Sequence, residues 1–539
     1  MFSARLIGIT AVLFLAAALT GCARGPRLLA EKDRVTLDRR VVEYPADLEL
    51  TTYAAGMTAP SAMAFVQDES EYKNALLIAE SGIGTDDPQV YGFKPDGTQF
   101  RVYPRGTNLP LFGRGFRIYG PIGGMAVAGG KIYVSHRDDS GMGVITAFDF
   151  DGAHRTVVAD MPANGDYALT DVAVHPSNGR LYFGLGAATN SGVVGLDNWE
   201  VGWVDANSSF CDRPLGDLKL NGFQFRTPNP RGGLFGGDDI VVTGPFQSFG
   251  ALGKLRIPGS TVRKPTAAVY SVSPEGGDLR VEAHGIRLPR GLVFNEFGNL
   301  FVTNNGMELR GTRPVKDDHD AIVRVPIGGQ VWYGWPDYSA DLEPIGQEKY
   351  QPPQEMIIRT GYPELAVVID HENSGLVPPD RNALLRARFA PLSGAAKMAL
   401  IGETAGDEFK AFRGNVIVAL NGDRSPFATG GRPLVGPQGF SVMRVDLDTK
   451  QTSDFVYNTK RLPLSMTPKG IDGLERPIDV KIGPDGALYI LDFGQLELRN
   501  GRERVKNKTG RVFRLGKQPT PSTQPTRPPT SDGPDVASS

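Results

Sequence analysis

Short apolar runs separated by Gly, Asn and Asp recur along the middle of the chain. One such unit consists of residues 291–294 and 300–303, joined by the turn Asn295–Asn299. β-Branched and aromatic residues favour strands, whereas Asn, Asp and Gly favour the tight turns between them. Each unit therefore predicts a pair of antiparallel strands. The pattern recurs at residues 61–80, 124–134, 172–183 and 478–490, and in a weaker form at 415–420 with 440–445.

Repeated strand units that cannot bury both faces alone are typical of β-propellers. The recurring units therefore predict an all-β fold, a six-bladed β-propeller over residues 44–516. Their uneven spacing predicts long loop insertions at about 195–265 and 337–408. Propeller loops gather at the ends of the central channel, so we expect a ligand site at one of these ends.

The first 22 residues predict a targeting signal rather than part of the fold. Residues 6–19 are almost wholly apolar after Arg5, and Leu19-Thr20-Gly21-Cys22 is similar to a bacterial lipobox. The apolar run is shorter than the ~20 residues that a membrane-spanning helix needs. We expect a cleaved lipoprotein signal peptide, a lipid on Cys22, and a protein anchored in the bacterial cell envelope on the periplasmic or outer face of a membrane. An ordinary secretory signal with an incidental cysteine is the alternative.

The two flanking segments differ in composition from the repeats. Residues 23–43 are polar and charged and predict a spacer, and residues 517–539 are rich in Pro, Thr and Ser. The C-terminal segment has too little apolar surface to offset the entropy of ordering, so we expect it to be disordered.

Composition excludes several classes of function. The chain has 2 Cys and 6 His, without the clustered spacing of a zinc site, and with Cys22 lipidated no disulfide is expected. The formal net charge of −2 provides no basic field, so no nucleic-acid partner is expected.

Several motifs, taken in their order along the chain, point to one family. They are Arg287-Leu288-Pro289-Arg290-Gly291-Leu292, Val302-Thr303-Asn304-Asn305-Gly306, Asp320-Ala321-Ile322, Tyr333-Gly334-Trp335-Pro336, Ala419-Leu420-Asn421-Gly422-Asp423-Arg424-Ser425 and Arg476-Pro477-Ile478-Asp479-Val480. With these motifs the chain resembles the quinoprotein glucose/sorbosone dehydrogenases. The resemblance implies a six-bladed propeller that oxidises sugars with pyrroloquinoline quinone (PQQ) and calcium.

The resemblance also implies how the cofactor would be held. PQQ is a tricarboxylate, and arginine forks bind carboxylates bidentately. The implied cofactor-binding residues are Arg287, Arg290, Arg424 and Arg476. For each of them, a salt bridge or a carbonyl cap between blades is the structural alternative.

The metal and the catalytic base are less well matched. The implied calcium ligands are the carbonyls of Gly306 and Met307, with Asp320 nearby in sequence. Where the family has a catalytic His, this chain has Tyr167, and Asp171 is the other candidate base. A Tyr with a pKa near ~10 is a poor base at neutral pH.

Three functions remain open on the sequence. The first is a membrane-tethered PQQ-dependent dehydrogenase that oxidises an aldose or a sorbosone-type aldehyde and passes electrons to an external acceptor. The second is a catalytically inactive propeller that acts as a binding or scaffold module of the envelope. The third, a calcium-dependent lactonase, would need a channel-facing set of Glu, Asn and Asp ligands that the sequence does not identify.

Overall fold

The computed structural model describes residues 25–105, 116–232, 238–258, 264–431, 436–468, 472–499 and 502–517. Cys22 and almost all of the predicted disordered tail lie outside these ranges. Within them, no helix is long and apolar enough to cross a membrane.

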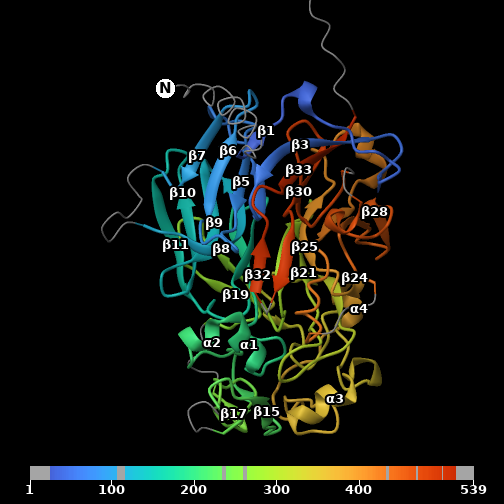
Figure 1. Ribbon diagram of the computed structural model, residues 1–539. Helices are drawn as coiled ribbons and strands as arrows, with labels where there is room; N and C mark the ends of the chain where they lie inside the picture. The colour runs from blue at the N-terminus through green and yellow to red at the C-terminus, as the bar shows by residue number, and fades with distance from the viewer. Residues whose placement is uncertain are drawn as a thin grey trace, which may run out of the picture.

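Six sheets of four or five strands form a six-bladed β-propeller, which confirms the predicted fold class (Figure 1). The innermost strands, one from each blade, are β4 (Pro60–Phe65), β8 (Tyr119–Ala128), β12 (Leu169–Val174), β20 (Pro289–Phe294), β25 (Ala395–Leu400) and β29 (Pro477–Ile482). The outer strands of the first three blades are β5 (Leu76–Glu80), β6 (Gln89–Phe93) and β7 (Gln99–Tyr103); β9 (Lys131–Arg137), β10 (Gly143–Phe148) and β11 (His154–Met161); and β13 (Leu181–Leu185), β18 (Ala268–Val272), β19 (Arg280–His284) and β23 (Val331–Trp332). Those of the last three are β21 (Leu300–Asn304), β22 (His319–Val325) and β24 (Leu385–Pro391); β26 (Val416–Leu420), β27 (Ser441–Val445), β28 (Thr452–Asn458) and β2 (Val42–Glu43); and β30 (Leu488–Asp492), β33 (Gly510–Gly516), β3 (Glu49–Met57) and β1 (Arg27–Leu28).

Glycines on the innermost strands let neighbouring blades approach closely around the channel. A Cβ added to Gly123 on β8 would lie 2.0 Å from the carbonyl oxygen of Leu169 on β12. A Cβ added to Gly291 on β20 would lie 2.3 Å from the carbonyl oxygen of Ala396 on β25. Any larger residue at these two positions would push adjacent blades apart.

The last blade contains strands from both ends of the chain. Strand β3 pairs antiparallel with β33, with Leu50 opposite Leu515, and so closes the ring. The segment predicted as a spacer also joins the propeller, because β1 pairs with β3 and β2 pairs with β28. The spacer prediction is wrong for this part of residues 23–43, since Leu37 and Val42 supply apolar side chains to the core there.

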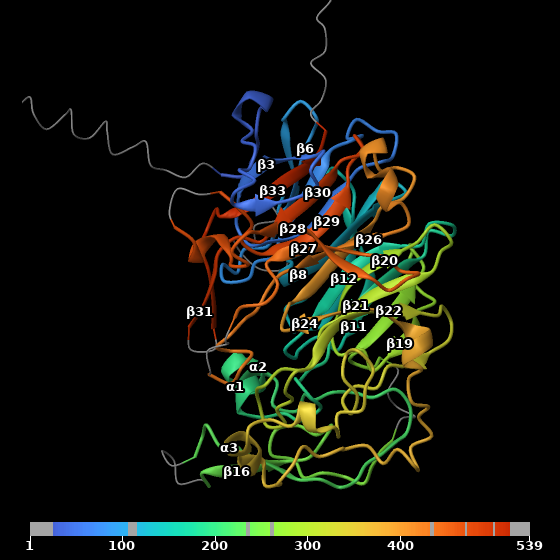
Figure 2. The same cartoon turned by 90° about the vertical axis from the view of Figure 1, so that its right-hand side faces the viewer.

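Most of the two predicted insertions lies together at one end of the propeller, below the blades in Figures 1 and 2, whereas α4 of the second lies beside β24. The first contains α1 (Leu196–Val201), α2 (Trp203–Ala206), β14 (Leu218–Lys219), β15 (Phe225–Pro228), β16 (Ile240–Thr243) and β17 (Arg256–Ile257). The second contains η3 (Glu348–Tyr350), α3 (Gln354–Ile357), η4 (Ile358–Thr360) and α4 (Arg381–Leu384). It ends earlier than predicted, because β24 and β25 belong to blades. The remaining short elements are η1 (Glu31–Asp33), η5 (Asp407–Phe412), η6 (Leu464–Met466), β31 (Leu496–Arg499) and β32 (Arg502–Val505).

Candidate functional site

A cavity of about 340 Å³ opens where the innermost strands begin, beside the insertions. We call it the mouth pocket. Its polar lining side chains include Asp166, Tyr167, Arg290, Asn305, Glu308, Asp320, Lys397, Asn421 and Arg424, and its apolar lining includes Ile83, Ile122, Leu169, Leu288, Ile478 and Phe493. A mixed lining of this size is typical of a small-molecule site.

Positive side chains converge on the mouth pocket. Arg290, at the start of β20, makes two long hydrogen bonds within the described chain, to the Gly394 carbonyl (3.3 Å) and to Asn421 Oδ1 (3.2 Å). Burial and the charges of Arg424 and Arg476 lower the pKa of Arg290 to about 10. Lys397 on β25 donates to the backbone carbonyls of Ser61 and Gly123. An anionic ligand would relieve the mutual repulsion of these groups.

Arg476 adds to this charge from behind the pocket wall. Its Nη1 donates to the carbonyls of Asn421 (3.2 Å) and Asp423 (3.1 Å). Burial and the charge of Arg424 lower the pKa of Arg476 to about 10. Of the four arginines predicted to bind a cofactor, Arg290 and Arg424 therefore line the mouth pocket, and Arg476 lies close enough to affect Arg290.

Arg287 has a different environment. It is 2% exposed and does not line the mouth pocket. Its guanidinium donates to the carbonyl of Asn190 (2.9 Å), Asn190 Oδ1 (2.9 Å), the carbonyl of Gly306 (2.6 Å) and Tyr167 Oη (2.7 Å). Protein acceptors therefore already engage this guanidinium on several sides.

Only one of the two candidate bases lines the mouth pocket. Tyr167 lines the pocket, and its hydroxyl accepts from Arg287 and donates to Glu308 Oε1 at 3.4 Å. Burial raises the pKa of Tyr167 despite the nearby Arg287, so the phenol is protonated at neutral pH. Asp171 on β12 does not line the pocket, and its Oδ2 accepts from the backbone N–H of Leu292 (3.1 Å). Burial also raises the pKa of Asp171.

Protein donors engage two of the predicted calcium ligands, the Gly306 carbonyl and the Asp320 carboxylate. The Gly306 carbonyl accepts from Arg287, and buried Met307 donates its N–H to Asp318 Oδ2 at 2.6 Å. The carboxylate of Asp320 accepts from Gly306 N, Asn305 Nδ2, Ser393 Oγ and Ala395 N. Within the described ranges, no group of three or more His, Cys, Asp and Glu side chains is arranged to hold a metal. Calcium at these residues stays a prediction.

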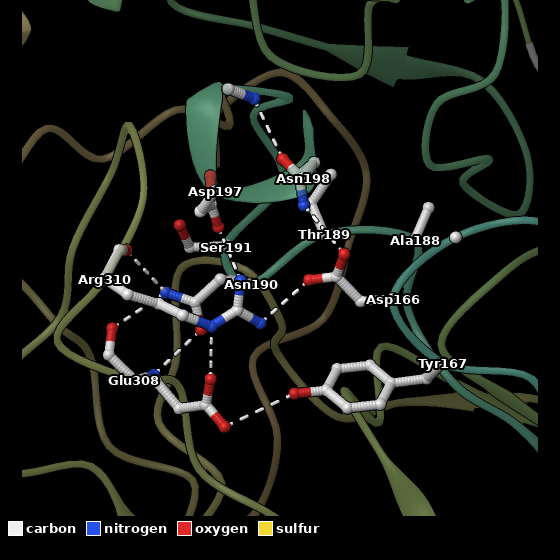
Figure 3. Close-up of polar contacts among 12 residues, drawn as sticks. Asp166, Tyr167, Ala188, Thr189, Asn190, Ser191, Asp197, Asn198, Glu308 and Arg310 are labelled. Carbon is white, nitrogen blue, oxygen red and sulfur yellow. Dashed lines mark hydrogen bonds and ion pairs between the residues drawn. The ribbon is translucent and has the colours of Figure 1, made fainter. Parts of the chain in front are cut away.

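Sequence reasoning missed a cluster of charged residues around Arg310, of which Asp166 and Glu308 line the mouth pocket (Figure 3). Arg310 pairs with Asp166 (2.8 Å), Asp197 (2.5 Å) and Glu308. Burial alone would raise the pKa of Glu308, but the charges of Arg310 and Arg287 lower it to about 2. Glu308 is therefore ionised and is a weak proton acceptor. Residues 166, 197 and 308–310 lie far apart in sequence and match no local motif, so only the fold brings them together.

No protein-family model and no curated protein matches this chain. Among solved structures, it is similar to the holo form of the pyranose dehydrogenase PQQ domain from Coprinopsis cinerea (13% identity, 89% of this chain and 98% of that chain, TM-score 0.48). It is also similar to a calcium structure of a Trichoderma reesei carbohydrate-active enzyme of family AA12 (14% identity, 90% and 98%, TM-score 0.47). A third is a putative glucose dehydrogenase from Thermus thermophilus (17% identity, 87% and 99%, TM-score 0.43). Identities at this level transfer no residue role to this chain.

Proposed function

We propose that the mouth pocket binds a flat, carboxylate-bearing cofactor of the PQQ class, and that the protein is a sugar or aldehyde dehydrogenase that uses it. The observation that carries the proposal is the convergence of Arg290, Lys397 and Arg424 on one cavity, where Arg476 adds to the charge that lowers the pKa of Arg290. Carboxylates are the natural partners of such a set, because arginine binds them through paired N–H groups.

Different residues of the mouth pocket would have different roles. Arg290, Arg424 and Lys397 would hold the carboxylates, and the apolar lining would exclude water around the ring system. A bound quinone of this class supplies an acceptor for hydride from the sugar or aldehyde carbon. Tyr167, held protonated between Arg287 and Glu308, orients a substrate oxygen by hydrogen bonding rather than removing a proton from it.

A second candidate function is binding of the same kind of ligand without turnover. The observation that favours it is the weakness of the bases in the pocket: the Tyr167 phenol stays protonated, and Glu308 has a pKa of about 2. Efficient general bases have pKa values near the working pH. In this case the protein is a ligand-binding propeller of the cell envelope.

Reconstitution distinguishes the two functions. The purified protein is titrated with PQQ, with and without Ca²⁺, while quinone absorbance and sugar-dependent dye reduction are followed. Saturable binding with turnover supports the dehydrogenase. Binding without turnover, with turnover restored by Tyr167→His, supports a binding propeller that has lost its base. No saturable PQQ binding, with or without Ca²⁺, overturns both proposals.

We also propose that Cys22 carries a lipid that anchors the protein in the bacterial envelope, because the sequence before it is similar to a lipobox. Stable anchoring commonly needs more than one acyl chain, so the modification should be multiple. Metabolic labelling with a fatty-acid analogue and membrane fractionation test this. Cys22→Ser should abolish labelling and move the protein to the soluble fraction, whereas Cys211→Ser should change neither result.

A further inference from the structure

A second cavity of about 370 Å³ lies among the insertions. We call it the insertion pocket. It is bounded by α1, β15, η4 and the loop 426–431, and no residue lines both it and the mouth pocket. Its size falls in the range of small-molecule sites, and its lining carries both acidic and basic side chains.

Three charged side chains of the insertion pocket have no protein partner. Glu200 on α1, Arg226 on β15 and Arg359 on η4 all line the cavity. Across the described ranges, no hydrogen bond or ion pair joins any of them to another side chain. Other exposed arginines of the insertions are paired, for example Arg231 with Asp205 and Arg256 with Asp217.

The elements that carry these three residues are fixed to one another. The backbone N–H of Leu196, at the start of α1, donates to Thr227 Oγ1 on β15 at 3.1 Å. At the end of η4, a Cβ on Gly361 would lie 3.5 Å from the Cδ of Arg226. The two guanidinium groups thus come from adjacent elements, and the carboxylate of Glu200 comes from the element next to them.

Two buried polar atoms of the same lining also lack a partner. Asp197 is 7% exposed and gives Oδ2 to Arg310, but its Oδ1 has no hydrogen bond. Thr312 is 5% exposed, and its Oγ1 has no hydrogen bond either. Buried polar atoms are seldom left unpaired, because each costs ~1–3 kcal/mol. Both residues line the insertion pocket, but these two oxygens have almost no accessible surface, so a ligand would meet them only if the side chains turned toward the cavity.

We propose that the insertion pocket binds a sugar acid, a polyhydroxylated ring that carries one carboxylate. Arg226 and Arg359 match the carboxylate, and Glu200 matches a hydroxyl group. The acidic side chains would disfavour a more highly charged ligand such as a sugar phosphate. This site is independent of the cofactor proposed for the mouth pocket.

Isothermal titration of the full chain tests this assignment with D-glucuronate, D-glucose, D-glucose 6-phosphate and L-glutamate. We expect D-glucuronate to bind at least about tenfold more tightly than each of the others, which corresponds to ~1.4 kcal/mol. Tighter binding of the phosphate or of glutamate overturns the sugar-acid assignment. Equal binding of D-glucose, or no binding of D-glucuronate, overturns the site.

The matched variants locate the binding. Arg226→Ala combined with Arg359→Ala should weaken D-glucuronate binding at least about tenfold. Arg101→Ala, at an exposed arginine on β7 outside both pockets, should leave it unchanged. The single variants Arg226→Lys and Arg359→Lys keep the positive charge but lose the paired N–H groups of the guanidinium, so each should give a smaller loss of D-glucuronate affinity. They also test the site if the double variant does not fold. D-glucuronate binding unchanged in all of these variants overturns the site.

Discussion

Arg287 and Arg290 lie three positions apart in one stretch of sequence, yet they have opposite environments. Arg287 is buried and donates to the Asn190 carbonyl and side chain, the Gly306 carbonyl and the Tyr167 hydroxyl. Arg290 lines the mouth pocket and has two long hydrogen bonds within the described chain. The number of protein acceptors around a guanidinium, rather than its place in a motif, separates the structural Arg287 from Arg290, which we propose to bind a ligand.

The largest effect on stability should come from replacing Arg287, whose guanidinium donates to several protein acceptors. Arg287→Met leaves the buried Gly306 carbonyl without a donor and removes a charge beside Glu308, so we expect the free energy of unfolding to fall by about 3–5 kcal/mol. Urea denaturation measures this loss. Arg290→Met should change the same quantity by less than about 1 kcal/mol, because it removes two long hydrogen bonds and relieves repulsion. Equal losses in the two variants would contradict the comparison.

Asp212 extends the comparison to a buried acid that is surrounded by protein hydrogen-bond donors. It is 2% exposed and accepts from Ala188 N (2.6 Å), Thr189 Oγ1 (2.6 Å) and Thr266 Oγ1 (2.8 Å). Burial raises its pKa to about 6 in spite of these hydrogen bonds. Unfolding therefore releases a proton between pH ~4 and ~6, and this residue lowers stability as the pH rises through that window.

The expected difference is measurable by urea denaturation across that pH range. Asp212→Asn should reduce the fall in the free energy of unfolding between pH ~4 and ~6 by about 1–3 kcal/mol. Above that window the contribution of Asp212 should no longer change with pH. Asp217→Asn, at an exposed carboxylate paired with Arg256, is the control and should leave the slope nearly unchanged. A slope unaltered by Asp212→Asn would show that the buried acid is ionised throughout.

PQQ affinity tests the role of Arg290 directly, whereas the stability measurements above test that of Arg287. Arg290→Met should weaken PQQ binding by at least about tenfold, because a desolvated guanidinium–carboxylate pair contributes ~1.5–3 kcal/mol. Absorbance titration measures the change, with Arg101→Met as the control outside the pocket. PQQ affinity that is unaffected by Arg290→Met would remove this residue from the binding set.

The smallest effect should come from the contact between Arg287 and the pocket wall. Tyr167→Phe removes one acceptor of Arg287, so we expect a loss of about 1 kcal/mol in the free energy of unfolding. Tyr457→Phe, at a partly exposed tyrosine on β28, should change it by less than about 0.5 kcal/mol. Matching changes in the two variants would indicate that the Tyr167 hydroxyl adds nothing to the network.

The strands were predictable because each carries its own local signal. The predicted pair at residues 291–294 and 300–303 corresponds to β20 and β21, with Leu292 opposite Val302. The weaker signal near residue 415 also marks a blade, where β26 pairs with β27. The alternation of apolar residues and the turn residues are local signals, and a stretch of a few positions is enough to specify most of one hairpin.

The charged cluster around Arg310 was not predictable in the same way. Glu308 and Arg310 follow a recognised turn, but their partners Asp166 and Asp197 belong to another blade and to an insertion. The polar segment before residue 44 gave no sign that β1 and β2 would complete two blades. Such contacts depend on where distant loops meet, and a single sequence contains no pattern for that.

The blade that contains both β3 and β33 sets the order in which this protein can be completed. The side chain of Thr51 bonds to the backbone of Arg514, 463 positions away. On the ribosome, the early blades emerge with the edge of β3 unpaired. The ring can close only after β33, near the end of the chain, has been synthesised. An unpaired strand edge is a template for association with other chains, so this interval is the stage of biogenesis at which aggregation is most expected. A permuted chain that begins between two blades would shorten that exposure without changing a contact in the finished ring.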